Sequence, residues 1–205
     1  MFYKVGHHKE AGLPHNPFKA IVAPRPIGWI STINSTGGIN LAPYSFFNAV
    51  SSAPPIVFFA PNGQSRESGI KDSQDNAERS GEFVTNLATW DLREEMNRTS
   101  AALGPTESEP EFAGLEMEAS ELVAPPRVKR SPVSLECRYL QTLELPSDSE
   151  DEGNFVVFGQ VVGIHIADHL VDANGLVKIT DAKPISRLGY MDYAVIEETF
   201  SMQRP

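Results

Sequence analysis

The sequence predicts a mainly β fold, a β-barrel with appended α-helices. Its 205 residues include 15 Gly and 16 Pro, spread between short runs rich in β-branched and aromatic residues. Two segments have the caps and spacing of a helix, and the strands do not alternate with helices as βαβ units require. We therefore expect one domain over residues 1–205, with residues 1–16 as an N-terminal arm.

Four strand segments are expected in the first half of the chain. They are rich in β-branched and aromatic residues and are bounded by Gly, Pro, Asn or Ser, at residues 27–33, 40–50, 56–60 and 81–87. Pro54 and Pro55 precede the third segment, and neither can donate a backbone hydrogen bond. The Pro pair is therefore expected at a turn or at a strand entrance.

Two helices are expected, at residues 72–79 and 91–103. The first ends just before Gly81, and Gly readily adopts the left-handed conformation that closes many helices. In the second, Asp91 and Glu94 have the spacing of a capping box at the helix N-terminus.

The second half of the chain is predicted to be β, with long strands at residues 134–145 and 155–166. Cys137 lies on the apolar side of the first strand, which favours a small buried hydrophobe over a nucleophile. His165 and His169 would form a metal-binding pair on a helix, but four residues of a strand span roughly 13 Å. We therefore expect no metal site.

The composition excludes several classes of protein. The net charge of −10 disfavours nucleic-acid and anionic-membrane surfaces, and no apolar run approaches the roughly 20 residues that span a bilayer. A single Cys and the lack of a basic stretch before an apolar run predict a cytoplasmic protein without a secretory signal. Neither a Rossmann fingerprint, a Walker motif nor a Gly-x-Ser-x-Gly elbow occurs.

The most informative stretch is residues 25–60. It interleaves hydroxyl and amide side chains with aromatic residues and Pro, a mixture that suits a flat heteroaromatic ligand with a polar tail. Downstream, an expected helix N-terminus, where a phosphate binds favourably, is supplied with two cations and a hydroxyl by Arg66, Lys71, Asp72 and Ser73. The alternative is that all of these are ordinary strand and turn residues.

Several blocks of the chain resemble the flavin reductase-like family of FMN-binding split barrels. The resemblance covers roughly residues 17–193, and its longest blocks are Arg-Pro-Ile-Gly-Trp-Ile-Ser-Thr at 25–32 and Asn-Leu-Ala-Pro-Tyr-Ser-Phe-Phe-Asn at 40–48. A shorter block, Lys-Asp-Ser at 71–73, has Ser where the family commonly has Thr. Ser keeps the hydroxyl group.

The resemblance implies a six-stranded split β-barrel with Greek-key connections. It also implies a homodimer that holds FMN near the dimer interface. Carried over position by position, the implied FMN-binding residues are Arg25, Trp29, Ser31, Thr32, Tyr44, Ser45, Phe46, Phe47, Asn48, Ser51, Lys71, Asp72 and Ser73.

Within that set the resemblance implies different roles. Ser31 and Thr32 would lie near the phosphate and ribityl chain, and residues 44–48 would follow the edge of the isoalloxazine. Ser51 and residues 71–73 would complete the polar end. Other roles stay open for some residues: Arg25 pairing with a carboxylate, Trp29 filling the core, and Arg187 and Tyr190 contacting flavin or a second subunit or serving only the structure.

The function implied is NAD(P)H-dependent reduction of flavin. The hydride passes between stacked nicotinamide and flavin rings, so no catalytic acid or base is expected from the protein. Reduced flavin would serve an oxygenase or another redox partner. The alternatives are a flavoredoxin-like FMN-binding electron-transfer protein that does not oxidise NAD(P)H, and a barrel-type interaction module without flavin.

Overall fold

The computed structural model describes residues 1–62, 70–104, 107–148 and 153–204. Its main feature is a seven-stranded antiparallel sheet with the order β3-β2-β6-β9-β10-β5-β4. The strands are β2 (Gly28–Ile33), β3 (Ile39–Tyr44), β4 (Phe47–Ser52), β5 (Pro55–Phe59), β6 (Glu82–Leu87), β9 (Val133–Leu145) and β10 (Asn154–Ile166). The expectation of a mainly β fold is confirmed.

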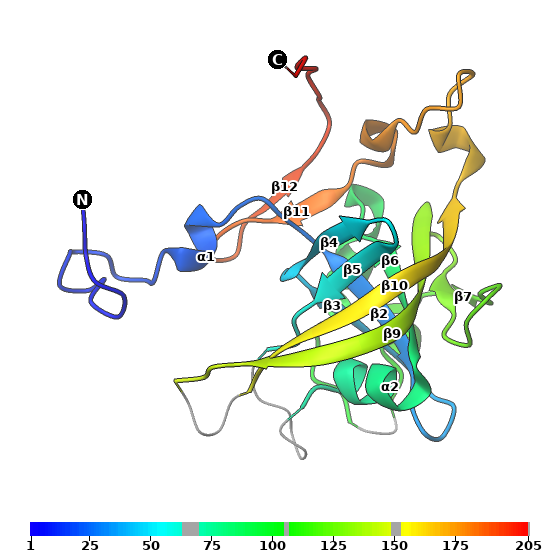
Figure 1. The fold of residues 1–205 in the computed structure, drawn as a ribbon, viewed down its shortest axis with the longest axis horizontal. Coiled ribbons are helices and arrows are strands. Elements are labelled where there is room, and N and C mark those ends of the chain that lie inside the picture. Colours follow the sequence, from blue (N-terminus) through cyan, green and yellow to red (C-terminus); the bar gives the residue numbers. More distant parts are fainter. Residues whose placement is uncertain (63–69, 105–106, 149–152, 205) are drawn as a thin grey trace.

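The sheet curls because its two edge strands are consecutive in the chain. Only Ser45 and Phe46 separate the end of β3 from the start of β4, although five strands lie between them in the sheet. Figure 1 shows these edges brought together around a barrel. The expectation of one strand at residues 40–50 was wrong, because that segment forms two strands, β3 and β4. The main sheet therefore has seven strands rather than the six that were expected.

The hairpin of β4 and β5 turns at Ala53 and Pro54, and Ser52 pairs with Pro55. The predicted position of the Pro pair, at a turn and a strand entrance, is confirmed. A Pro is tolerated there because the turn needs no ladder hydrogen bond from it.

The first expected helix is confirmed as α2 (Asp72–Ser80), and Gly81 closes it with a φ of +76°. The second was overextended. It consists of a 3₁₀ turn, η1 (Trp90–Leu92), and α3 (Arg93–Arg98), without a side-chain cap. It ends where the buried Thr99 donates its hydroxyl to the Met96 carbonyl and accepts a hydrogen bond from Trp29.

Smaller elements complete the fold. They are α1 (Phe18–Ile21), α4 (Glu109–Ala113), β1 (Arg25–Pro26), β7 (Met117–Glu118), β8 (Arg127–Val128), η2 (Asp168–Leu170), η3 (Ile179–Ala182), β11 (Ile185–Arg187) and β12 (Tyr193–Val195). Strands β1, β11 and β12 form a small sheet, and α2 lies at the far end of the barrel from it (Figure 1). The longest helix of the described residues is α2, with nine residues, and none is a candidate to cross a membrane.

Two apolar clusters hold these layers together. The cluster inside the barrel takes residues from five strands and from α2, among them Ile30, Phe59 and Phe83. Cys137 belongs to it and is fully buried, as predicted, and burial raises the pKa of its thiol. The second cluster packs α3 and α4 on the outer face of β2 and β3. Alternate residues of β2 therefore face different cores.

Candidate functional site

Three of the candidate residues meet in a buried polar network between the barrel and α2. The hydroxyl of Tyr44 lies 3.0 Å from that of Ser73, which accepts a 2.8 Å hydrogen bond from the amide of Asn40. The Thr32 hydroxyl accepts hydrogen bonds from the amides of Asn40 (3.4 Å) and Asn76 (3.1 Å). The network thus joins positions 32, 44 and 73, which are far apart in the sequence.

The hydroxyl groups of this network face each other rather than solvent. Thr32 is fully buried and Ser73 is 1% exposed. Burial raises the pKa of Tyr44 to about 12, so its hydroxyl stays protonated and remains a donor. These side chains can act on a ligand through the backbone that they position, because they fix the first turn of α2 on the sheet.

The N-terminus of α2 is the part of this region that reaches the surface. Lys71 precedes the helix and is half-buried, and Asp72 is exposed. Within the described residues, no side chain caps the helix at this end, and Arg66, whose charge was also expected here, lies outside the described residues. Its first N–H groups and the Lys71 ammonium can therefore accept an anion.

Trp29 and Ser31 lie on the other face of β2, where both are fully buried. The indole N–H of Trp29 donates a 2.9 Å hydrogen bond to Thr99, and the Ser31 hydroxyl donates to the carbonyl of Pro126. The structure therefore places Trp29 in the core, the other role that the sequence left open for it.

The connection between β3 and β4 places its side chains in different surroundings. Phe47 points inward onto Gly28, where an added Cβ would lie only 2.5 Å from its ring. Asn48 is exposed, and Ser51 is half-buried at an irregularity of the β4–β5 ladder. Of the candidate residues, two are exposed, Asn48 and Asp72, and six are half-buried: Tyr44, Ser45, Phe46, Phe47, Ser51 and Lys71.

Arg25 is buried, with 7% of its surface exposed, and it binds backbone rather than a carboxylate. Its guanidinium donates to the carbonyls of Lys19 and Val22, and to that of Leu188 at 2.6 Å. It therefore ties the segment around α1 to the chain that follows β11. The same guanidinium lies 5.9 Å from the centre of the Phe46 ring.

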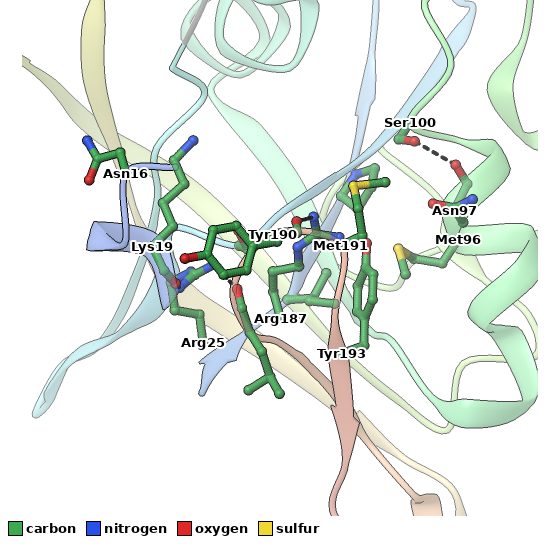
Figure 2. A pocket seen from close by; sticks show the side chains of 14 residues that line it. Asn16, Lys19, Arg25, Met96, Asn97, Ser100, Arg187, Tyr190, Met191 and Tyr193 are labelled. Carbon is green, nitrogen blue, oxygen red and sulfur yellow. Dashed lines mark hydrogen bonds between the residues drawn. The ribbon is translucent and has the colours of Figure 1, made fainter. Parts of the chain in front are cut away.

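A cavity of about 500 Å³ opens beside these residues. Pro43 of β3 and Ser45 of the β3–β4 connection are among the residues that line it. Figure 2 shows Met96 and Asn97 of α3 on one side and Asn16 of the N-terminal arm and Lys19 of α1 on the other, with residues 187–193 between them. Sequence reasoning missed the contributions of the arm and of α3, because no local pattern marks which distant segments close around a strand end.

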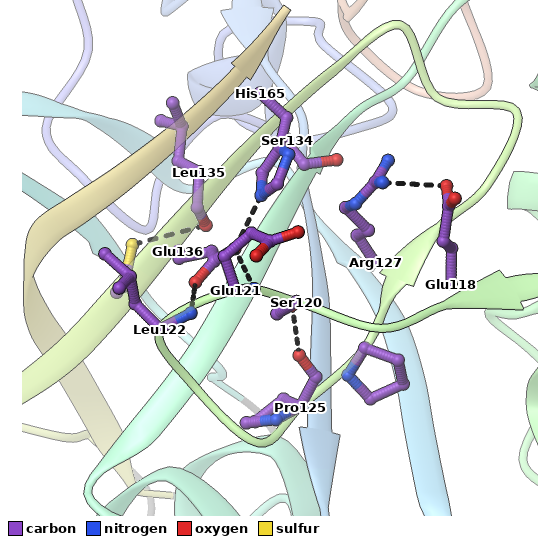
Figure 3. Close-up of polar contacts among 12 residues, drawn as sticks. Glu118, Ser120, Glu121, Leu122, Pro125, Arg127, Ser134, Leu135, Glu136 and His165 are labelled. Atoms are coloured by element: carbon purple, nitrogen blue, oxygen red, sulfur yellow. Dashed lines mark hydrogen bonds and ion pairs between the residues drawn. The ribbon is translucent and has the colours of Figure 1, made fainter.

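A second polar cluster lies on the outer face of β9 and β10 (Figure 3). The Glu136 carboxylate is 1% exposed and accepts hydrogen bonds from the backbone N–H groups of Glu121 (2.8 Å) and Leu122 (2.6 Å). His165 Nε2 lies 2.5 Å from the same carboxylate. Among the residues that the structure describes, no three His, Cys, Asp or Glu side chains gather to hold a metal.

Comparisons with known proteins identify relatives over most of the chain. The model of the flavin reductase like domain matches residues 22–185. YwrF from Bacillus subtilis is 35% identical over 185 residues, which cover 90% of this chain and 89% of YwrF.

Two solved structures are similar to the whole chain. Nitrilotriacetate monooxygenase component B from Bacillus cereus is 30% identical with a TM-score of 0.87, over 98% of each chain. Flavoredoxin of Desulfovibrio vulgaris is 15% identical with a TM-score of 0.75, over 98% of this chain and 97% of its own. A third solved structure, named as a flavin reductase with split barrel domain from Shewanella frigidimarina, is 18% identical with a TM-score of 0.83, over 100% of each chain. The expected split-barrel fold is confirmed by the curled sheet and by these matches.

Proposed function

Because the chain belongs to the flavin reductase-like domain family, we propose that it binds FMN and that NADH or NADPH reduces this flavin. The observation that carries the proposal is the surface at the β3–β4 connection. There Ser45 and Phe46 connect the two edge strands of the sheet, β3 and β4, and a cavity large enough for a second ring lies beside them. Membership of the family supports a flavin-related redox function, and the choice of electron donor is our proposal.

The residues present fit the two ends of FMN. At the phosphate end, the uncapped N-terminus of α2 and Lys71 supply N–H donors and a positive charge. At the ring end, Ser45, Phe46 and Asn48 supply backbone groups and an aromatic face on the surface. Thr32 and Ser73 support the phosphate end from beneath, by holding α2 against the sheet.

Bound FMN supplies the two-electron chemistry, so the protein has to bind and orient rather than transfer protons. The β3–β4 connection would orient the ring, and the cavity beside Ser45 would leave one ring face accessible to a partner ring. Dipoles of the backbone N–H groups at this connection would favour the negative charge of the reduced ring.

Two rival functions use the same surface differently. A flavoredoxin-like carrier would bind FMN and receive electrons from a protein. The fold that the chain shares with a flavoredoxin is compatible with this alternative. An interaction module would bind no flavin. We further propose a homodimer, and an oxygenase as one acceptor of the electrons, since one structural relative is named as a monooxygenase component.

The deciding experiment is an absorption spectrum of the FMN-loaded protein under nitrogen, before and after NADH or NADPH is added. We expect the visible flavin band to disappear with at least one nucleotide. Tight FMN binding without any bleaching would favour the electron carrier. A protein that neither holds FMN nor quenches its fluorescence would leave only the interaction module.

A charge substitution tests the phosphate end. Lys71→Gln is expected to weaken FMN binding and to leave riboflavin binding unchanged, because riboflavin has no phosphate. Lys9→Gln, an exposed change in the N-terminal arm, is the matched control. Equal weakening of FMN and riboflavin by Lys71→Gln would argue against a phosphate at this helix.

A further inference from the structure

A second cavity, of about 390 Å³, lies where the chain leaves β8 and enters β9 beside the end of β10. Its lining residues come from two segments, 127–132 and 164–167. The segments are joined where the Ala167 N–H donates a 2.8 Å hydrogen bond to the Pro132 carbonyl. Ligand cavities generally measure roughly 300–1,000 Å³, so this β8–β10 cavity suits a small molecule.

The β8–β10 cavity is separate from the surface proposed for FMN. Helix α2 contacts the other end of β9, where the Thr142 hydroxyl donates a 2.7 Å hydrogen bond to Glu78. From Val133 to Thr142 the strand runs roughly 30 Å at the usual rise per residue. As far as the described residues go, the cavity beside Ser45 shares no lining residue with this one.

The side chains around the β8–β10 cavity favour an anion. Arg127 and Lys129 both line it, whereas the described lining residues include no Asp or Glu and no Phe, Tyr or Trp. The chain as a whole has a net charge of −10, so most of its surface repels anions. Two cations at one cavity therefore create a local attraction that the rest of the protein lacks.

Arg127 has a buried donor that a ligand could satisfy. Its Nη2 group forms a 2.8 Å ion pair with Glu118, which lies opposite it in the β7–β8 ribbon. Its Nε atom is buried and has no hydrogen-bond partner among the residues that the structure describes. A buried N–H group without a partner is costly, and an anionic oxygen would relieve that cost. Figure 3 shows the Arg127–Glu118 pair beside the ring of His165, which also lines the cavity.

The ion pairs of the two cations leave room for a ligand. Lys129 pairs with Glu116 at 2.6 Å, and the Glu116 and Glu118 side chains are 74% and 45% exposed. Such exposed pairs contribute little, because water screens them. Each pair also uses a single donor, whereas a guanidinium has five N–H groups and an ammonium has three. A ligand can therefore bind both cations without first breaking a strong interaction.

We propose that the β8–β10 cavity binds a phosphate group. Several oxygens of a tetrahedral dianion can accept hydrogen bonds at once, from the guanidinium fork of Arg127 and from the Lys129 ammonium. His165 forms part of the wall, since its Nε2 is directed at Glu136. The phosphate group belongs either to inorganic phosphate or to a phosphate monoester. Its binding needs no flavin and is independent of the proposed function.

The first test is a calorimetric titration of the FMN-free full-length protein with inorganic phosphate, at constant ionic strength. It is run on the unmodified protein and on Lys71→Gln, which weakens binding at the N-terminus of α2. We expect Lys71→Gln to keep a phosphate site. Addition of Arg127→Gln/Lys129→Gln should weaken that site by at least roughly tenfold, the usual effect of one lost charge-assisted hydrogen bond.

The matched control is Lys9→Gln/Arg98→Gln, which removes the same charge at exposed positions outside both cavities and should leave phosphate binding unchanged. The proposal is overturned if the unmodified protein binds no phosphate or if Lys71→Gln abolishes the binding. It is equally overturned if the cavity variant and the control lose the same affinity.

Single substitutions keep the result independent of any effect on folding. Lys129→Gln changes an exposed side chain and should weaken phosphate binding by itself. Glu118→Gln should tighten it severalfold, because it removes a repelling charge and frees the Nη2 group of Arg127. A purely structural role of the Arg127–Glu118 pair predicts no such gain. Glu94→Gln, in the exposed pair with Arg93, is the control and should change nothing.

The second test separates the two sources of phosphate by titration with glycerol 3-phosphate and with glycerol, its neutral counterpart. Binding of glycerol 3-phosphate at least as tight as that of inorganic phosphate identifies a monoester, and weaker binding identifies free phosphate. Either result supports the site, whereas equal binding of glycerol and glycerol 3-phosphate contradicts it. Failure of FMN binding would contradict the proposed function alone, because these titrations need no flavin.

Discussion

Arg25 and Glu136 are two buried charged side chains that hold irregular backbone in place. Arg25 donates to three backbone carbonyls and joins the segment near α1 to the one after β11. Glu136 accepts from two backbone N–H groups and joins the loop before β8 to β9. In both places a charged side chain forms the hydrogen bonds to backbone groups that a helix or sheet would otherwise provide.

The two regions differ in how the charge is balanced. Glu136 has His165 as a third hydrogen-bonding partner, and the loop covers its carboxylate. Arg25 lines an open cavity together with Arg187 and Lys19, and none of the described residues that line it carries a carboxylate. A balanced buried charge serves the fold alone, whereas an unbalanced one beside a cavity leaves an attraction for a ligand.

The largest effect is expected where the balanced charge is removed. Glu136→Ala leaves two buried N–H groups without an acceptor and should lower the free energy of unfolding by about 3–5 kcal/mol. Urea denaturation measures the change. Glu121→Ala, at an exposed neighbouring position, is the control. An equal loss in both variants would mean that the carboxylate does not hold the loop.

Removal of Arg25 should lower the free energy of unfolding less than removal of Glu136. It should also loosen the segments near the two ends of the chain that Arg25 joins. Arg25→Gln is expected to lower the free energy of unfolding by about 2–3 kcal/mol, since hydrogen bonds to charged groups contribute about 1.5–3 kcal/mol and neighbouring ones do not add fully. Limited proteolysis should then cut the region around α1 first. Arg98→Gln is the exposed control. Unchanged proteolysis would show that packing of Ala20 on Gly189 holds the segment without Arg25.

The uncharged polar network between α2 and the barrel can be compared with the two buried charges, Arg25 and Glu136. Thr32→Val keeps the shape of the side chain and removes the acceptor of the Asn40 and Asn76 amides. We expect a loss of about 1–2 kcal/mol, measured by urea denaturation. Thr36→Val, in the exposed turn after β2, is the matched control. No difference between the two would contradict a stabilising role for this network.

The smallest effect is expected in the pH dependence of stability. Burial alone raises the pKa of Glu136, but the hydrogen bonds from Glu121, His165 and Leu122 outweigh it and leave the pKa below the ordinary 4.5. A lowered pKa stabilises the fold above the unfolded-state value, and this stabilisation is lost as the pH falls through the folded-state value. The difference in unfolding free energy between the unmodified protein and Glu136→Gln should therefore shrink below pH 4.5. A constant difference would contradict this assignment.

Local sequence patterns predicted much of the fold. The strand that contains Trp29, the helix after Lys71 and the buried position of Cys137 all follow from residue type and spacing. The break at Ser45 and Phe46 did not, because it comes from closure of the barrel and leaves the run of β-forming residues unchanged. The early end of α3 was missed for a similar reason, since Trp29 binds Thr99 from 70 residues away.

The candidate site divides in the same way. Residue types alone predicted that residues 25–60 and 71–73 contain the polar and aromatic groups that a ligand with rings and a phosphate needs. Tertiary structure decided which of them reach the surface: Ser45 and Lys71 do, whereas Ser31 and Thr32 are buried. It also decided that Arg25 binds Leu188, 163 residues later. Periodicity reports which face of a strand is apolar, but the partner that covers that face is set by long-range packing.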